Sequence, residues 1–328
     1  MNPFQYSRPT ETAAAIKALA KEPDAFFLAG GTNLIDLMKM GVATPETLVD
    51  INRLPLAGIE PITGGLRLGA LATNSAVADN PLVLEGYPLL SQAINAGASP
   101  QLRNMATVGG NLLQRTRCSY FFDLTMPCNK RAPGSGCGAM EGINRMHAIF
   151  GASDKCIAVN PSDMSVAMAA LDATVRVKGP AGERVIKFRD FHRLPGDQPE
   201  LDNTLQKGEL IIAVDLPAAE FKKHVHYLKI RDRSSFAFAL VSVAAALNIA
   251  GDGTIREARL AMGGVAHKPW RLFASEEYLK GKPAGEETFS QAAQLAMQGA
   301  KAYSYNQFKL KLAPNAIRYA LKTAAGMV

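Results

Sequence analysis

The stretch LAGGTNLIDLMK, residues 28–39, decides the fold of the N-terminal part of the chain. It starts at the end of a short apolar run, Ala25–Leu28, that predicts a buried strand, and it continues into a periodic segment that predicts a helix near Leu34 to Met38. The glycine pair between them forms a turn. Another strand is predicted at Leu48 to Ile51, and this alternation of strand and helix favours parallel strand pairing.

A second diglycine loop, TVGGNL at residues 107–112, is similar to the first. Adjacent glycines allow consecutive backbone N–H groups to turn toward one point, and no Cβ obstructs an approaching anion. The helix after the first loop adds the partial positive charge of its N-terminus. A single glycine pair is usually only a tight turn, but two such loops could hold the two phosphates of a dinucleotide. Neither loop has the GxGxxG or Walker pattern of common nucleotide sites.

The rest of the chain predicts a mixture of strands and helices. Apolar and polar residues alternate in several strand-length segments, and AGDG at residues 250–253 predicts a hairpin between two of them. We place a domain boundary near Pro217 to Lys223. A third glycine pair, Gly263-Gly264, is explained by a turn at the end of a strand. The predicted strands are 65–70, 173–178, 209–216, 226–230, 238–249 and 254–262; the predicted helices are one capped by Thr10, 87–96, 286–302 and 315–323.

The composition indicates a soluble folded protein with a sizeable core. The chain has 328 residues, of which 48% are hydrophobic, and this length suggests about two domains. The net charge of +7 is moderate, and lysines and arginines form no stripe interleaved with aromatics, which argues against a nucleic-acid binder. Residues 1–12 lack the pattern of a secretory signal, and the longest apolar stretch, residues 236–250, is too short to cross a bilayer.

All four cysteines lie in one excursion that is rich in turn-forming residues. A long irregular loop of this kind is uncommon in a compact domain unless something orders it. Disulfides, a structural zinc ion and a four-thiolate iron–sulfur cluster are all possible, although the chain lacks a secretion signal and the paired C-x2-4-C spacing typical of zinc. An excess of nearby cations favours an anionic cluster. The cysteines are Cys118, Cys128, Cys137 and Cys156.

Three motifs in order resemble the flavoprotein subunits of the xanthine dehydrogenase and carbon monoxide dehydrogenase group. They are LAGGTNLIDLMK, SPQLRNMATVGGNL at residues 99–112, and GGVAHKPWR at residues 263–271. The cysteine segments NLLQRTRC, PCNKRAPGSGC and CIAVNPSDM resemble the FAD subunits of bacterial periplasmic aldehyde oxidoreductases, which carry a [4Fe–4S] cluster on such an insertion. Most members of the group lack these cysteines. The flavin subunit of 4-hydroxybenzoyl-CoA reductase also has a cluster insertion, but its ligands are spaced differently.

The resemblance implies an α+β fold with two domains. The first, residues 1–220, is expected to be a two-lobed FAD-binding domain of the vanillyl-alcohol-oxidase-like type. Its lobes would span about residues 1–54 and 55–220, with the iron–sulfur insertion at about 115–160. A smaller α+β domain of the carbon monoxide dehydrogenase flavoprotein type, residues 221–328, would follow.

The resemblance also implies which residues bind cofactors. Asp163 matches an aspartate that contacts the flavin nucleotide, although by itself it would be a helix N-cap before Met164. Lys229 matches a lysine near the flavin, although by itself it would be an ordinary strand lysine. The four cysteines would be the ligands of the [4Fe–4S] cluster. The FAD contacts implied in the two loops are Leu28, Ala29, Gly30, Gly31, Thr32, Asn33, Leu34, Ile35, Thr107, Gly109, Gly110 and Asn111.

The expected function is electron transfer within a molybdenum hydroxylase. No substrate-activating residue is evident, because the five histidines form no metal or triad signature. Partners implied are a large molybdenum-cofactor subunit and a small subunit with [2Fe–2S] clusters, whose electrons would reach FAD and then an external acceptor. The resemblance favours a periplasmic location by co-export with a signal-bearing partner, with the cytoplasm as the alternative. A stand-alone flavin oxidase and a zinc-stabilised interaction module are competing hypotheses. The histidines are His147, His192, His224, His226 and His267.

Overall fold

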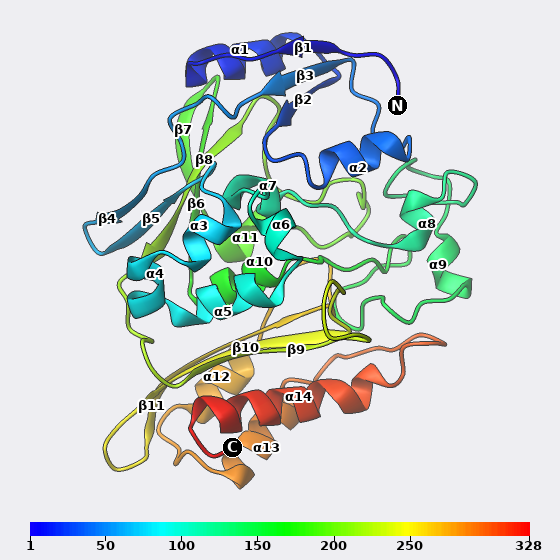
Figure 1. Ribbon diagram of the computed structural model, residues 1–328. Helices are drawn as coiled ribbons and strands as arrows, with labels where there is room; N and C mark the ends of the chain where they lie inside the picture. The colour runs from blue at the N-terminus through cyan, green and yellow to red at the C-terminus, as the bar shows by residue number, and fades with distance from the viewer.

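The structure is a computed structural model that describes residues 1–328, and it contains three β-sheets (Figure 1). The first sheet has the strand order β1-β3-β2, formed by β1 (Gln5–Ser7), β3 (Thr47–Asp50) and β2 (Ala25–Leu28). Both strand pairs are parallel, which confirms the expected pairing. Helix α1 (Thr12–Lys21) packs Ala15 and Ile16 against this sheet.

Near the first sheet, one prediction from the sequence is wrong and another is confirmed. The N-cap of α1 is Glu11, without a side-chain cap bond, so the prediction of Thr10 as the cap was wrong by one residue. Helix α2 (Leu34–Lys39) follows the first diglycine loop as predicted.

The second sheet is antiparallel and has the order β4-β5-β8-β6-β7. Its core side is covered by short helices, among which α10 is buried at every residue because its sequence is apolar or small on all sides. The strands are β4 (Ile59–Ile62), β5 (Gly65–Gly69), β6 (Thr174–Gly179), β7 (Gly182–Lys187) and β8 (Leu210–Pro217); the helices are α3 (Asn74–Ala78), α4 (Pro81–Gly86), α5 (Pro88–Ala96), α6 (Pro100–Arg103), α7 (Val108–Leu112), α10 (Asp163–Ala170) and α11 (Phe188–Phe191).

The third sheet separates two hydrophobic cores. Alternate residues of β10 (Val241–Ile249) face opposite sides: Val243 and Ala245 join the core under the C-terminal helices, whereas Ala244 and Ala246 join the core around α5 and α10. Burial on both faces explains why the strand is a nearly continuous apolar run. The order is β12-β11-β10-β9, with β9 (Val225–Ile230), β11 (Ile255–Gly263) and β12 (Trp270–Arg271), all antiparallel.

The C-terminal helices lie on the outer face of this sheet (Figure 1). They are α12 (Phe273–Leu279), α13 (Glu286–Leu295) and α14 (Lys309–Ala324). The hairpin at residues 250–253 is confirmed, but β10 starts at Val241 and not at 238. Helix α13 ends before the predicted 302, and α14 begins before the predicted 315, with Pro314 inside the helix. No helix is long and apolar enough to cross a membrane.

The cysteine excursion has almost no regular structure, as its sequence predicts. Between α7 and α10 the chain forms only the single turns α8 (Ser119–Phe122) and α9 (Gly138–Glu141). It lies beside α2, where Leu37, Phe121 and Cys128 form a small buried cluster. Two cations tie the excursion down: Arg115 Nε and Lys130 Nζ lie 2.7 and 2.5 Å from the two carboxylate oxygens of Asp202.

Candidate functional site

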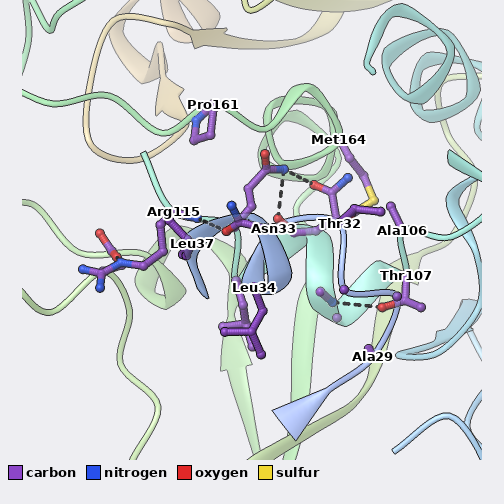
Figure 2. A pocket seen from close by; sticks show the side chains of 18 of the residues that line it. Ala29, Thr32, Asn33, Leu34, Leu37, Ala106, Thr107, Arg115, Pro161 and Met164 are labelled. Carbon is purple, nitrogen blue, oxygen red and sulfur yellow. Dashed lines mark hydrogen bonds and ion pairs between the residues drawn. The ribbon is translucent and has the colours of Figure 1, made fainter. Parts of the chain in front are cut away.

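A cavity of about 900 Å³ lies where the two diglycine loops meet (Figure 2). Its volume is at the upper end of the range for small-molecule and cofactor sites. Leu28 and Ile35 do not line it. The other predicted contacts in the first loop (Ala29, Gly30, Gly31, Thr32, Asn33, Leu34) and second loop (Thr107, Gly109, Gly110, Asn111) do, together with Asp163 and Lys229.

The first loop presents a run of backbone donors that no protein group uses. The amides from Gly30 through Leu34 donate no hydrogen bond, and the first amides to be bonded are those of Ile35, to Gly31 O, and Leu37, to Asn33 O. Gly31 has φ +72°, a conformation that favours glycine and turns successive amides toward one point. Successive free amides in such a turn form an anion-binding concavity.

The second loop differs, because its own protein environment uses the amides. Val108 N and Gly109 N donate to Ala72 O and Ala70 O, and Gly110 N donates to Thr107 Oγ1 at 3.2 Å. Thr107 is therefore the N-cap of α7, an interaction drawn in Figure 2. This loop offers a glycine surface free of Cβ atoms, whereas the free amides belong to the first loop.

The two loops touch at Gly30. A Cβ atom on Gly30 would lie 1.8 Å from the carbonyl oxygen of Met105, two residues before Thr107. Only glycine permits this approach of one backbone to the other. The first loop is thus held against the segment that leads into the second, and both form one continuous wall of the cavity.

The asparagines of the two loops are also not equivalent. Asn111 is fully bonded: its Nδ2 donates to Asn74 Oδ1, and its Oδ1 accepts from Ser162 and Gln114. Asn33 Oδ1 accepts from Arg115 N at 2.9 Å, but Asn33 Nδ2 is buried and has no partner (Figure 2). A buried donor without an acceptor is costly unless a ligand or water supplies one.

Asp163 and Lys229 come together at another wall of the cavity. Lys229 Nζ on β9 donates to Asp163 Oδ2 at 2.7 Å and to Ala96 O at 3.1 Å. Tyr227 OH donates to Asp163 Oδ1 at 2.8 Å, and burial, together with this carboxylate, holds the pKa of Tyr227 well above its usual value. The N-cap of α10 is Ser162, whose hydroxyl accepts a hydrogen bond from Ser165 N. Asp163 is the first residue of the helix, so the alternative prediction that Asp163 is the N-cap was wrong.

A further wall contains residues that sequence reasoning missed. Arg117 lies 5.2 Å from the ring centroid of Phe238, and Arg233 lies 5.5 Å from that of Phe236. Burial lowers the pKa of Arg117 from its usual value. A smaller cavity of about 340 Å³ adjoins this wall and extends from Asp163 and Phe238 to Cys118. Arg233, Phe236 and Phe238 were detectable only as a basic and aromatic stretch without a motif, and Arg117 lies far from them in the sequence.

The four cysteines are all free thiols. Cys128 and Cys137 face each other across an isolated antiparallel bridge. Burial raises the pKa of Cys118 to about 12, with smaller contributions from Cys128 and Cys156; burial likewise raises the pKa of Cys156 to about 11, with contributions from Cys137 and Cys128. No group of three or more His, Cys, Asp or Glu side chains lies close enough to hold a single metal ion.

Comparisons with known proteins identify the class of this fold and site. Residues 2–219 match the family described as the FAD binding domain in molybdopterin dehydrogenase, and residues 226–324 match the C-terminal domain of the carbon monoxide dehydrogenase flavoprotein. The chain therefore belongs to the FAD-binding medium subunits of the molybdenum hydroxylase family, as its motifs predicted, and it is an oxidoreductase subunit.

Particular relatives are similar over the full chain. The aldehyde oxidoreductase FAD-binding subunit PaoB of Escherichia coli (strain K12) is 48% identical over 99% of both chains. The carbon monoxide dehydrogenase medium chain of Afipia carboxidovorans is 26% identical over 98% of this chain and 96% of its own. Among solved structures, quinoline 2-oxidoreductase from Pseudomonas putida 86 matches with a TM-score of 0.77 at 27% identity, covering 100% of this chain and 99% of that chain. These matches confirm the α+β fold predicted from the sequence.

Proposed function

We propose that this chain is the electron-transfer subunit of a molybdenum-dependent aldehyde oxidoreductase. Bound FAD would supply the switch between one-electron transfer from a [2Fe–2S] partner and delivery to an external acceptor. The full-length similarity to an aldehyde oxidoreductase subunit supports the substrate class, which a partner molybdenum subunit would oxidise. The observation that carries the cofactor assignment is the run of unused amides from Gly30 to Leu34 at the wall of a 900 Å³ cavity.

The residues of the cavity fit an FAD molecule. The five free amides and Asn33 Nδ2 would bind the pyrophosphate, because they are donors without acceptors. Gly109 and Gly110 would leave room for the phosphates to approach, since their amides are already used. Asp163 and Lys229 would face the nucleotide and the flavin, while Arg117 and Phe238 would cover the cavity and limit the access of water. Leu28 and Ile35 would support the loop without lining the cavity.

A charge placed at the first loop tests the FAD assignment. Thr32→Asp places a carboxylate among the free amides, whereas Thr32→Asn has a similar size and no charge. We expect Thr32→Asp to lose most of the bound FAD and Thr32→Asn to keep it, measured as flavin released per purified complex. Equal flavin content in the two variants would show that the phosphates bind elsewhere.

We also propose that Cys118, Cys128, Cys137 and Cys156 hold a [4Fe–4S] cluster. The support is four free cysteines in one irregular excursion, of which Cys128 and Cys156 are buried. A tetrahedral zinc site would need sulfurs about 3.8 Å apart, given Zn–S bonds of about 2.3 Å. Four cysteine thiolates are the usual ligand set of a [4Fe–4S] cluster, and the cysteines of this excursion supply that set.

Metal analysis separates the cluster from zinc. We expect iron and acid-labile sulfide in the [4Fe–4S] ratio, a yellow-brown colour from cluster and flavin together, and loss of iron in Cys137→Ser. Zinc without iron would favour a zinc-stabilised module and refute the cluster. Iron content unchanged in Cys137→Ser would remove that cysteine from the ligand set.

The organisation of the complex follows from the same proposal. Partners would be a large molybdenum-cofactor subunit and a small [2Fe–2S] subunit, and the chain would divide into a FAD domain at residues 1–220 and a C-terminal domain at 221–328. Co-export with a signal-bearing partner would place the complex in the periplasm, which cell fractionation tests. Aldehyde turnover by this chain alone would instead support a stand-alone flavin oxidase.

A further inference from the structure

Two buried histidines face two of the four cysteine sulfurs. His147 Nε2 lies 3.1 Å from Cys118 Sγ, and His267 Nε2 lies 3.3 Å from Cys156 Sγ. Both rings are buried, and neither Nδ1 atom has a hydrogen-bond partner. Each ring thus directs its Nε2 at a cysteine sulfur. Two independent segments of the chain repeat the same contact, although sequence spacing gave no sign of either.

We propose that His147 and His267 donate Nε2–H hydrogen bonds to the Cys118 and Cys156 thiolates and thereby raise the reduction potential of the cluster. This inference rests on the proposed [4Fe–4S] site. A metal-bound thiolate has no proton, so it can only accept, and the ring nitrogen that faces it must carry the hydrogen. Hydrogen bonds to the ligand sulfurs are among the factors that set the potential of iron–sulfur clusters.

The sign of the effect follows from charge. One-electron reduction adds one negative charge to the cluster and its thiolates, and no proton is taken up. The reduced form therefore accepts the N–H···S bonds more strongly than the oxidised form does, since charge strengthens hydrogen bonding. Removing a donor destabilises the reduced form more and lowers the potential. Each ring faces the sulfur with Nε2 and has no partner at Nδ1, so its one N–H is placed at the sulfur.

A buried lysine holds the backbone of both histidine segments. Lys309 Nζ, at the start of α14, donates to His147 O at 2.8 Å and to Gly264 O at 2.7 Å, three residues before His267. Asn306 Nδ2 donates to His147 O at 3.1 Å. Ile149 N also donates to Val265 O, which joins the two segments directly. Both imidazole rings are thus positioned from the C-terminal part of the chain, and Lys309 is a positioning residue.

The test uses the complete complex and compares donors with non-donors. His147→Gln and His267→Gln keep an N–H group at similar reach, whereas His147→Phe and His267→Phe keep a ring and lose the donor. In a redox titration followed by electron paramagnetic resonance, with dithionite as the reductant, we expect each Phe variant to have a roughly three- to tenfold lower reduced-to-oxidised ratio at a fixed potential. Tenfold corresponds to 59 mV for a one-electron couple. The Gln variants should titrate close to the wild type.

Iron, sulfide and flavin contents identify which idea fails. Phe variants that keep iron, sulfide and the wild-type potential would overturn the role of the histidines and leave the cluster in place. Iron lost equally from Gln and Phe variants would overturn it too, because the ring itself would then be needed. Wild-type complex without iron would overturn both proposals. Flavin at the wild-type level is the folding control, and His147→Leu replaces His147→Phe if the phenylalanine ring prevents folding.

Discussion

Lys229 Nζ lies 2.7 Å from Asp163 Oδ2, and the two side chains are only 4% and 9% exposed. Asp163 begins α10, a helix that packs against the third sheet, whereas Lys229 belongs to β9 of that sheet. The ion pair therefore joins two layers of the molecule at the wall of the main cavity. Removing one partner of a buried pair leaves an uncompensated charge, which typically costs more than the pair contributes.

We expect Asp163→Asn and Lys229→Met each to lower the free energy of unfolding by about 3–5 kcal/mol. The double variant Asp163→Asn/Lys229→Met should lose less than the sum, because it leaves no buried charge. Urea denaturation of all four proteins measures this coupling. Additive losses would mean that the two side chains act independently and that the ion pair is not formed in solution.

Gly30→Ala should separate the two diglycine loops. The new Cβ would overlap the Met105 carbonyl oxygen, 1.8 Å away, and neither backbone can yield as a side chain does. We expect at least a tenfold loss of FAD affinity, measured by flavin titration of the deflavinated complex. Gly251→Ala is the control, since nothing lies within 4 Å of its Cβ position. Tight FAD binding by Gly30→Ala would contradict the close approach of the loops.

Stability should fall with decreasing pH partly because of His192. This ring is buried, its Nε2 lies 2.9 Å from Leu112 O, and burial lowers its pKa to about 4. Below pH 6.5 the imidazole is protonated in the unfolded chain but stays neutral in the folded protein. The stability that the neutral ring contributes is complete above pH 6.5 and is lost as the pH falls toward 4. For one such group the loss between pH 7 and pH 5 is about 2 kcal/mol.

Comparison with His192→Gln isolates this contribution. The variant should be less stable at pH 7 but should lose about 2 kcal/mol less than the wild type on going to pH 5. Denaturant titrations at the two pH values supply both numbers. Equal losses of unfolding free energy in the two proteins would show that His192 is protonated with its ordinary pKa and is not held neutral.

Asp202→Asn should loosen the cysteine excursion. Burial would raise the pKa of Asp202, but Lys130 and Arg115 outweigh burial and hold that pKa below its usual value. The Lys130 side chain is 1% exposed, so loss of the carboxylate leaves a buried cation and costs about 3–5 kcal/mol. Hydrogen exchange of residues 128–138 should become faster. Asp197→Asn is the control, because Asp197 is 91% exposed and its pair with Lys155 contributes little. Equal exchange in both variants would refute the role of Asp202.

Local pattern was sufficient to predict many elements of the fold. The strand at 25–28, the parallel pairing of the first sheet and the hairpin at 250–253 follow from periodicity, alternation and turn residues within a few positions. The insertion of β8 between β5 and β6 could not be predicted, because strands about 145 residues apart pair there through contacts between distant segments. Helix α14 extends through Pro314, whereas the predicted helix began after that proline, at residue 315.

The site was predictable as a set of motifs but not as a set of contacts. The diglycine pairs were visible in the sequence, but their difference was not: Ala70 and Ala72 use the amides of the second loop, and no partner uses those of the first. The contacts of His147 with Cys118 and of His267 with Cys156 join positions that are 29 and 111 residues apart in the sequence. Spacing along the chain contains no information about such contacts.

The pairing of Asp163 with Lys229 also constrains how this protein can be rearranged over evolutionary time. A recombination breakpoint between these positions would take the carboxylate from one parent and the ammonium from the other. Each recombinant protein would then have to preserve the geometry of the ion pair or bury an uncompensated charge. The segments on either side of such a breakpoint are therefore coupled through this one buried ion pair.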